Sequence, residues 1–248
     1  MTPNSSHVWL VTGAASGIGA AVVRTVADAG CSVFALDIDD EAGNALEGAH
    51  YRHLDVASER DWQTLADYLK SSDNALGIPD RIHLNAGIQI APPDAAMTEY
   101  RFESMTPEKY RKLMGVNIDG VVFGLHTLLP LLNPGSSIVV TASLAGITPY
   151  PIDPLYSMSK HAVVGLVRSL GPSLRKRGIN IHAICPGAID TPLVPVAQRS
   201  EDVPFMAPEH VASEVIHLME QDETGKTWAK VSDGKPLFIV RAPGDKQK

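Results

Sequence analysis

Hydrophobic residues fall into two alternating patterns along the chain. Short runs rich in β-branched residues, bounded by turn residues, alternate with longer segments whose apolar positions recur about every 3.6 residues, the period of an α-helix. The short runs mostly lack regular polar alternation, which is typical of strands buried on both faces. The pattern predicts strands at residues 8–12, 32–37, 50–55, 81–85, 136–142, 180–185 and 227–231.

The segments between these strands predict helices at residues 17–29, 41–46, 58–71, 107–132, 157–177 and 208–220. Two of them have clear start signals, because Ser58 can cap its helix and Thr106 precedes Pro107 at a first helical position. Helices between parallel strands provide right-handed crossovers. The sequence therefore predicts an α/β, Rossmann-like doubly wound sheet, mostly parallel and seven-stranded, with helices on both faces.

Length and composition indicate a folded chain with one sizeable core. The 248 residues are 44% hydrophobic and 20% charged, and we expect a single domain over residues 1–248. Segments 88–104 and 187–207 interrupt the alternation, are rich in proline, alanine and polar residues, and follow strand ends. Ligands bind at that edge of open α/β sheets, so both segments are expected to be substrate lids, with plain surface excursions as the alternative.

Charge and residue distribution exclude several partners. A net charge of -7 provides no attraction for nucleic acid or anionic lipid. Residues 1–7 lack the features of a leader, and no run of about 18 uninterrupted apolar residues follows. We therefore expect a cytoplasmic protein with no nucleic-acid or membrane partner. Cys31 and Cys185 lie in apolar runs, and the nine histidines lack zinc-ligand spacing, so no catalytic metal is predicted.

The first predicted strand leads directly into a glycine-rich turn at residues 12–19. Glycines let the backbone approach a pyrophosphate closely, and the N–H groups and dipole at a helix start favour its negative charge. Such a pattern also occurs in ordinary turns, so its position between strand and helix matters. The residues expected to bind a dinucleotide here are Gly13, Ser16, Gly17, Ile18 and Gly19.

Asp37 ends the second predicted strand, where its carboxylate can accept hydrogen bonds from the adenosine ribose and would repel a 2′-phosphate. No Arg or Lys lies in the glycine-rich turn or directly after Asp37, so NAD is predicted rather than NADP. A helix cap or loop role is the alternative for Asp37. The third and fourth strands end in further candidates for cofactor binding: Asp55, Val56, Asn85, Ala86 and Gly87.

Tyr156 and Lys160 are four residues apart in a predicted helix, so their side chains share one face. A phenol has a pKa near 10, and a neighbouring cation favours its phenolate, so Lys160 could make Tyr156 a base. Pairs with this spacing also arise by chance. Ser143 follows the fifth strand, where its hydroxyl could hydrogen-bond a substrate oxygen or simply form a turn.

Several motifs occur in order along the chain: Thr12-Gly13 with Gly17-Ile18-Gly19, Asn85-Ala86-Gly87, Asn117, Ser143, Tyr156, Lys160 and Pro186-Gly187. Together they resemble the signature of the short-chain dehydrogenase/reductase family, and the resemblance covers residues 8–231. Residues 143–146, 159–161 and 180–187 are also similar to the 15-hydroxyprostaglandin dehydrogenase-like branch, which uses NAD to oxidise secondary alcohols.

The resemblance implies roles for these residues. Tyr156 would remove the alcohol proton, Lys160 would lower the tyrosine pKa and hold the nicotinamide ribose, and Ser143 would orient the substrate oxygen. Asn117 would disturb its helix and support a water that relays the proton from Lys160. The nicotinamide side would be lined by Pro186, Gly187, Ile189 and Thr191, with the Thr191 hydroxyl near the carboxamide.

These observations predict an NAD-dependent oxidoreductase that oxidises a secondary alcohol to a ketone, with a small-molecule alcohol or ketone as its partner. A carbonyl reductase using NAD(P)H and a non-catalytic dinucleotide sensor are the alternatives. The apolar helices at residues 121–132 and 162–174 are the ones that family members pair, so a homodimer or homotetramer is expected. Complete burial of these helices within one chain is the alternative.

Overall fold

The computed structural model describes residues 2–199 and 204–242 and contains one eight-stranded sheet, in the order β3-β2-β1-β4-β5-β6-β7-β8. The first seven strands are parallel, and β8 pairs antiparallel with β7. The predicted α/β fold is confirmed. The strands are β1 (Val8–Thr12), β2 (Ser32–Asp37), β3 (His50–His53), β4 (Arg81–Leu84), β5 (Ser137–Thr141), β6 (Asn180–Pro186), β7 (Lys226–Lys230) and β8 (Phe238–Ile239).

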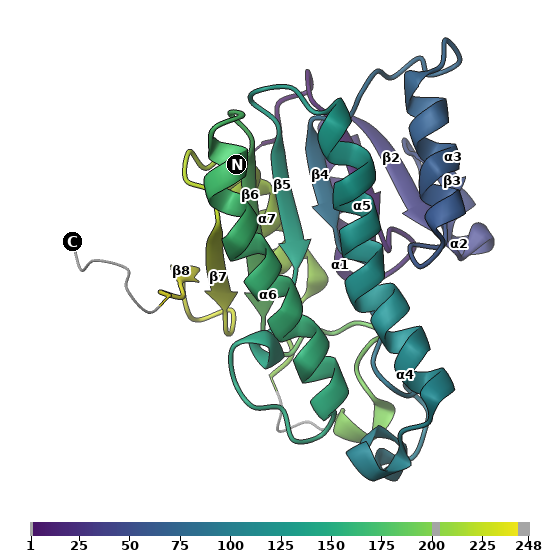
Figure 1. Cartoon of the computed structure of the whole chain (residues 1–248), viewed down its shortest axis with the longest axis vertical. Coiled ribbons are helices and arrows are strands. Elements are labelled where there is room, and N and C mark those ends of the chain that lie inside the picture. The colour runs from purple at the N-terminus through teal and green to yellow at the C-terminus, as the bar shows by residue number, and fades with distance from the viewer. Residues whose placement is uncertain (1, 200–203, 243–248) are drawn as a thin grey trace.

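Helices cover both faces of the sheet. In Figure 1, α3, α5 and α6 lie in front of the strands, and α1 and α7 lie behind them. Each face has its own hydrophobic cluster, one including Trp62, Leu125 and Val167 and the other including Val22 and Val215. The helices are α1 (Gly17–Asp28), α2 (Asp40–Asn44), α3 (Glu59–Lys70), α4 (Pro107–Met114), α5 (Gly120–Leu128), α6 (Pro154–Arg175) and α7 (Pro208–Met219).

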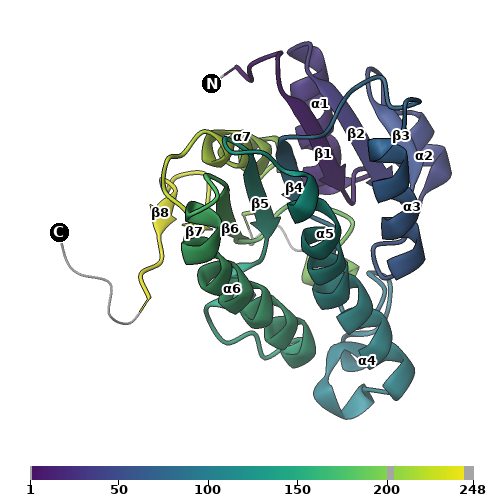
Figure 2. The ribbon, with the colours of Figure 1, turned by 45° about the horizontal axis from the view of Figure 1, so that its top comes forward.

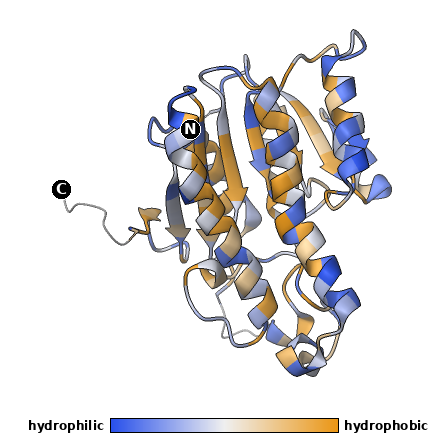
Figure 3. Cartoon of the chain, viewed as in Figure 1, coloured by the Kyte–Doolittle hydropathy of each residue, from blue (hydrophilic) through white to orange (hydrophobic). Residues whose placement is uncertain are grey.

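The burial of the central strands explains their apolar sequences. Every residue of β4 and β5 is buried, and only the first residue of β1 is partly exposed. Strands covered by helices on both faces need apolar side chains on both sides, which removes the polar alternation of a half-exposed strand. Figure 3 shows the same arrangement, with hydrophobic colour on the central strands and on helices against them.

The strand order predicts a crevice at the carboxyl edge of the sheet. β1 lies between β2 and β4, so the sheet first grows on one side of β1, through β2 and β3, and then on its other side from β4 onward. Figure 2 shows β1 and β4 side by side. Ligands of doubly wound sheets bind where the strand order reverses. The loops that follow β1 and β4 begin at Gly13 and Asn85, and both therefore lie at this position.

One long helix was predicted over residues 107–132, and the structure has one continuous helical segment, Pro107–Leu131, that contains a π-helical turn. The α4 helix ends at Met114, a π-helical turn occupies Gly115–Asp119, and α5 follows before a 3-10 turn at Leu129–Leu131. The hydrophobic period continues across these changes, so periodicity alone did not show the interruption. The side chain of Asn117 hydrogen-bonds the backbone of Ile88, and this contact fixes the interrupted segment to the loop after β4.

Other element boundaries also differ from the prediction. The α6 helix begins at Pro154 rather than at residue 157, because Asp153 accepts a hydrogen bond from the Tyr156 backbone N–H and Pro154 occupies the first turn. The α2 helix covers Asp40–Asn44, and β3 ends at His53. β8 makes the predicted seven-stranded sheet eight-stranded; its two residues are too few to show a strand period.

The helical segment Pro107–Leu131 is long and apolar enough to cross a membrane by length and composition, with a mean hydropathy of 1.3. Its most apolar window is 44% buried in the protein. Val121, Leu125 and Leu128 are buried in the same cluster as Trp62 of α3. The helix therefore packs as a core helix of the sheet.

The contact between α6 and the turn before β7 gives a first prediction. A Cβ added at Gly171 would lie 2.4 Å from the Cα of Gly225, whereas a Cβ at Gly165 on the same helix would meet nothing within 4 Å. We expect Gly171→Ala to reduce the free energy of unfolding by about 3 kcal/mol because the backbone must move. Gly165→Ala should increase it by about 1 kcal/mol, since Ala favours helix. Urea denaturation measures both, and equal effects would contradict the close packing.

Candidate active site

The glycine-rich turn after β1 requires glycine at its closest contacts. Gly13 has a φ of 63°, and a Cβ there would lie 2.9 Å from the Cα of Ala86. A Cβ on Gly19 would lie 2.0 Å from the carbonyl oxygen of Gly13. These contacts bring the start of α1 against the ends of β1 and β4, which places a helix N-terminus at the crevice.

This helix start fits the phosphates of a dinucleotide. Ser16 is the N-cap of α1 but makes no side-chain capping bond, and the first turn has no acidic residue. Among the described residues, no side chain caps the backbone N–H groups of this first turn. These N–H groups and the positive end of the helix dipole can therefore bind an anion. Gly17 and Ile18 begin the helix, and Ile18 is partly buried against the cluster under α1 and α7.

Asp37 contacts the glycine-rich turn directly. Its carboxylate accepts hydrogen bonds from the backbone N–H groups of Ala15, Ile38 and Asp39, at 2.8, 2.7 and 3.1 Å. The N-cap of α2 is Asp39 and not Asp37, so Asp37 does not cap that helix, and the loop role considered for Asp37 stays open. Asp37 therefore places a carboxylate beside the turn that would hold the pyrophosphate.

Asn85 joins the ends of three strands. Its backbone N–H donates to the hydroxyl of Thr12 at 2.9 Å, and its side-chain amide donates to the carbonyls of Thr12 and Gly13. The hydroxyl of Thr141 in turn donates to the Asn85 side-chain oxygen at 3.0 Å. The Thr12 hydroxyl also accepts from the N–H of Ala86. This network fixes the Asn85-Ala86-Gly87 segment against the glycine-rich turn.

The two candidates after β3 differ in exposure. Asp55 is exposed, and its carboxylate accepts a hydrogen bond from the backbone N–H of Ala57 at 2.9 Å. Val56 is 7% exposed and packs against Gly120, where an added Cβ would approach its side chain to 2.8 Å. Asp55 can therefore meet a ligand with its side chain, whereas the side chain of Val56 is largely occupied in the core.

Ser143, Tyr156 and Lys160 come together below the end of β5. Tyr156 and Lys160 lie in the first turns of α6, with the Lys160 amine 5.6 Å from the centre of the Tyr156 ring. Ser143 follows β5, and its side chain hydrogen-bonds Tyr156. Tyr156 and Lys160 are only 7% and 3% exposed. The structure thus brings these three predicted catalytic residues together, with Tyr156 and Lys160 buried and Ser143 partly exposed.

Burial dominates the ionisation of this group. Burial raises the pKa of Tyr156, and the hydrogen bond from Ser143 acts in the opposite direction. Burial also lowers the pKa of Lys160 to about 8. The Lys160 amine donates to the backbone carbonyl of Thr141 at 3.0 Å, which holds it in place. The lowering of the Tyr156 pKa by Lys160 stays a prediction.

Asn117 is fully buried and does not occupy a surface position. Its side-chain oxygen accepts from the N–H of Ile88, and its amide donates to the Ile88 carbonyl and the Ser159 hydroxyl. A Cβ on Gly87 would lie 3.2 Å from the Lys160 nitrogen and 3.5 Å from the Asn117 oxygen. Gly87 therefore leaves room for Asn117 and Lys160 to meet at one place. The water relay implied for Asn117 stays a prediction.

The segment after β6 reaches the same edge. β6 ends at Pro186, and the N–H of Gly187 donates to the carbonyl of Lys230 at 2.9 Å. Ile189 is buried, and Thr191 packs against the glycine-rich turn, where a Cβ on Gly17 would lie 2.9 Å from its methyl carbon. The four residues predicted for the nicotinamide side, Pro186, Gly187, Ile189 and Thr191, therefore follow one path along the crevice.

Sequence reasoning missed two residues that position this site. The fully buried carboxylate of Asp153 accepts from the N–H groups of Ile90 and Tyr156, at 2.8 and 2.9 Å, and thereby joins the loop after β4 to α6. An Asp followed by Pro154 is a helix-start signal that could have located it. Thr141 holds Lys160 and Asn85 together, but its position at a strand end gave no specific signal.

Comparison with known proteins identifies the family. The family model for short chain dehydrogenase matches residues 7–202. This chain belongs to the short-chain dehydrogenase family. It is therefore an oxidoreductase whose family uses nicotinamide cofactors, and its substrate is a small molecule.

Three curated relatives of the chain are dehydrogenases or reductases by name. It is 34% identical over 210 residues to the 2,5-dichloro-2,5-cyclohexadiene-1,4-diol dehydrogenase of Sphingobium indicum, covering 82% of this chain and 79% of that protein. It is 30% identical to the levodione reductase of Leifsonia aquatica, over 90% and 83% of the two chains. It is also 30% identical to the cyclohexanol dehydrogenase of an Acinetobacter species, over 93% and 94%. The 15-hydroxyprostaglandin dehydrogenase-like branch stays a prediction.

The buried lysine gives a second prediction. Its folded pKa of about 8 lies below the ordinary 10.5, so between these values the unfolded chain binds more protons and stability rises with pH. From pH 7 to pH 10, the unfolding free energy of the wild type should rise relative to Lys160→Met by about 2.5 kcal/mol. Urea denaturation at each pH measures this difference. Lys70→Met, at an exposed lysine ending α3, is the control, and a flat Lys160 difference would contradict the lowered pKa.

Proposed function

We propose that this protein is an NAD-dependent dehydrogenase that oxidises a secondary alcohol to a ketone. The observation that carries the proposal is the group of the partly exposed Ser143 with the buried Tyr156 and Lys160 at the carboxyl edge of the sheet. The glycine-rich turn lies at the same edge, beside the loop after β4. Relatives named cyclohexanol dehydrogenase and cyclohexadienediol dehydrogenase support a ring-bearing secondary alcohol as the substrate.

The residues of the site have distinct roles in this proposal. The Ser143 oxygen accepts a hydrogen bond from the N–H of Ala145 at 3.1 Å, which fixes the hydroxyl so that it can orient the alcohol oxygen. Tyr156 accepts the proton of the alcohol O–H, and Lys160 stabilises the phenolate and binds the nicotinamide ribose. Bound NAD supplies the acceptor for the hydride that leaves the carbinol carbon. Asn117 keeps the loop after β4 beside Lys160.

An apolar environment around Tyr156 suits this chemistry. Ile90, Ala145 and Leu155 are buried in one cluster with Tyr156, and Tyr150 and Leu193 pack against it. Exclusion of water strengthens the interactions of the reacting charges and protects the proton transfer. The raised pKa of Tyr156 follows from the same burial, so ionisation of the phenol depends on positive charge nearby.

Asp37 supports NAD as the cofactor. A carboxylate at this position can accept hydrogen bonds from ribose hydroxyls and repels a 2′-phosphate. Residues 13–19 and 38–41 contain no Arg or Lys that would neutralise such a phosphate. The backbone N–H groups around Asp37 fix the carboxylate but bring no side-chain cation to it.

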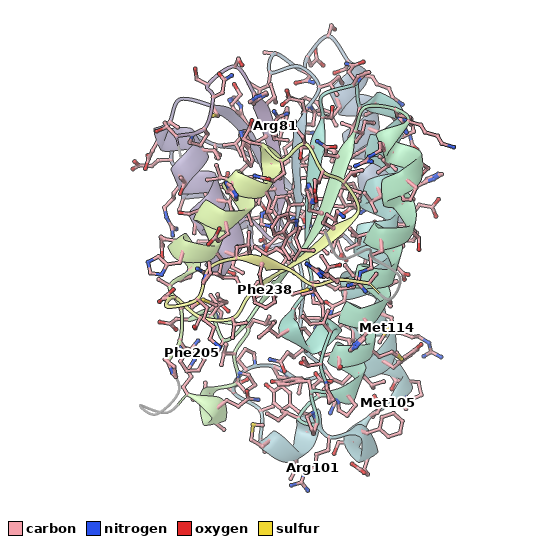
Figure 4. All side chains as sticks on the ribbon, turned by 90° about the vertical axis from the view of Figure 1, so that its left-hand side faces the viewer. Arg81, Arg101, Met105, Met114, Phe205 and Phe238 are labelled. Atoms are coloured by element: carbon pink, nitrogen blue, oxygen red, sulfur yellow. The ribbon has the colours of Figure 1, made fainter. Side chains whose placement is uncertain are left out.

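We also propose that residues 1–248 form one domain in which segments 88–104 and 187–207 close over the substrate; residues 200–203 lie outside the described part. The two segments touch, because the N–H of Val196 donates to the carbonyl of Pro93 at 2.8 Å. In Figure 4, the labelled residues Arg101, Met105 and Phe205 lie toward the end of the molecule that holds these segments.

The proposed assembly is a homodimer or homotetramer in the cytoplasm. Val122 on α5 and Met158 on α6 are 41% and 44% exposed, so both helices present apolar side chains to solvent. Such exposed apolar surface supports pairing with another copy. Among the described residues, no group of three His, Cys, Asp or Glu could hold a metal ion, and the absence of a catalytic metal stays a prediction.

Replacement of the proposed base is the direct test. Tyr156→Phe should reduce kcat for a secondary alcohol by about 1000-fold while leaving NAD affinity within about threefold, since it removes only the phenolic oxygen. Initial rates of NADH formation and fluorescence titration with NAD measure the two quantities. Tyr110→Phe, at an exposed tyrosine of α4, should keep the wild-type rate. Retained turnover in Tyr156→Phe would remove Tyr156 from the mechanism.

Cofactor choice is tested at Asp37. Asp37→Asn removes the negative charge but keeps an oxygen acceptor, so the ratio of kcat/KM with NAD to kcat/KM with NADP should fall by about tenfold or more. Asp39→Asn, at the exposed cap of α2, removes the same charge two residues away and should change the ratio by less than about threefold. A wild-type preference for NADP would overturn the cofactor assignment.

A further inference from the structure

Three polar side chains gather beside Tyr156. The ring of Tyr150 contacts the ring of Tyr156, with centroids 6.1 Å apart. The Tyr150 hydroxyl donates to the side-chain oxygen of Gln198 at 3.2 Å, and the Gln89 side chain lies near enough to Tyr150 to act on the pKa of its phenol. These residues come from the loop after β4, the segment before α6 and the 3-10 turn Val196–Gln198. We name Gln89, Tyr150 and Gln198 the glutamine cluster.

The glutamine cluster contains two buried atoms without partners. The Oε1 atom of Gln89 and the Nε2 atom of Gln198 make no hydrogen bond to any described residue. Gln89 is 9% exposed, and its own amide nitrogen donates to the carbonyl of Leu193 at 3.1 Å, which fixes the orientation of the side chain. Buried polar atoms almost always have partners, so these two require an explanation. One is an acceptor and the other is a donor.

The surroundings of the glutamine cluster are apolar. Ile90, Ala145 and Leu155 are buried around Tyr156, and Ile152 and Leu193 pack against the same hydrophobic cluster. A ligand pocket with apolar walls and a few polar atoms binds an apolar body and recognises one polar group on it. The unpartnered atoms of the glutamine cluster are suited to that recognition.

We propose that the glutamine cluster binds a second hydroxyl group of the substrate, so that the enzyme selects alicyclic diols over alcohols with one hydroxyl. A hydroxyl can donate to the Gln89 oxygen and accept from the Gln198 nitrogen, whereas a ketone or a carboxylate can only accept. The Tyr150 ring joins the glutamine cluster to Tyr156, so a substrate with one oxygen at Tyr156 can present a second oxygen to the glutamine cluster. The proposal rests on the proposed oxidation of a secondary alcohol.

The test compares cyclohexane-1,4-diol with 4-methylcyclohexanol, in which a methyl group replaces the second hydroxyl. With NAD, the wild-type kcat/KM should favour the diol by at least about tenfold after correction for its two equivalent hydroxyls. Gln198→Met should reduce kcat/KM for the diol about tenfold and change that for 4-methylcyclohexanol less than about threefold. Gln89→Met should also reduce kcat/KM for the diol more than kcat/KM for 4-methylcyclohexanol. Gln63→Met, at an exposed glutamine of α3, is the control and should leave the selectivity unchanged.

Measurements of alcohol binding distinguish a failure of the hydroxyl subsite from a failure of the proposed oxidation. Calorimetric titration of each alcohol into the protein with NADH present measures selectivity without turnover. Selective diol binding that Gln198→Met removes, together with no oxidation of either alcohol, would reject the proposed function and retain the hydroxyl subsite. Equal binding of the two alcohols by the wild type, or equal losses for both in Gln198→Met, would overturn the subsite. If Gln89→Met does not fold, the partly exposed Gln198 position still carries the test.

Discussion

The burial of the Lys160 amine is the constraint on which the site depends. A lysine that is 3% exposed loses most of its hydration, and its pKa falls to about 8 as a result. The Thr141 carbonyl accepts a hydrogen bond from the amine, which offsets part of the free energy lost on burial. The residue lies in the second turn of α6, which fixes its position. Perturbed pKa values of this kind cluster at functional sites, which supports the proposed role of Lys160. The phenol of Tyr156 is also buried, and its pKa is raised by the loss of hydration.

The strands determine where these side chains can meet. Parallel strands all end at one edge, and the reversal of order between β1 and β4 opens that edge beside Gly13 and Asn85. Two buried side chains then join the loops to the helices: Asn117 holds the loop after β4 to the π-helical turn, and Asp153 holds the same loop to α6. The proposed catalytic group is therefore positioned by hydrogen bonds between buried side chains and the backbone as well as by its own contacts.

Features that repeat along the chain could be predicted, and features that depend on single contacts could not. The seven parallel strands and the glycine-rich turn follow from apolar runs and from glycine spacing, and the structure has them. The π-helical turn preserves the apolar period of its helix, so periodicity does not indicate it, whereas the family resemblance implies a local disturbance at Asn117. The glutamine cluster joins residues 89, 150 and 198, whose proximity depends on loop paths that no period encodes.

The short β8 strand also affects how the sheet ends. An unpaired strand edge offers free N–H and C=O groups that can recruit a strand from another chain. β8 occupies part of that edge of β7, and the N–H of Val240 adds a bond to the Thr227 carbonyl. At the opposite border, β3 is only four residues long and carries His50, Arg52 and His53. Short edge strands offer few unpaired N–H and C=O groups, so each border of the sheet presents only a small template for strand addition.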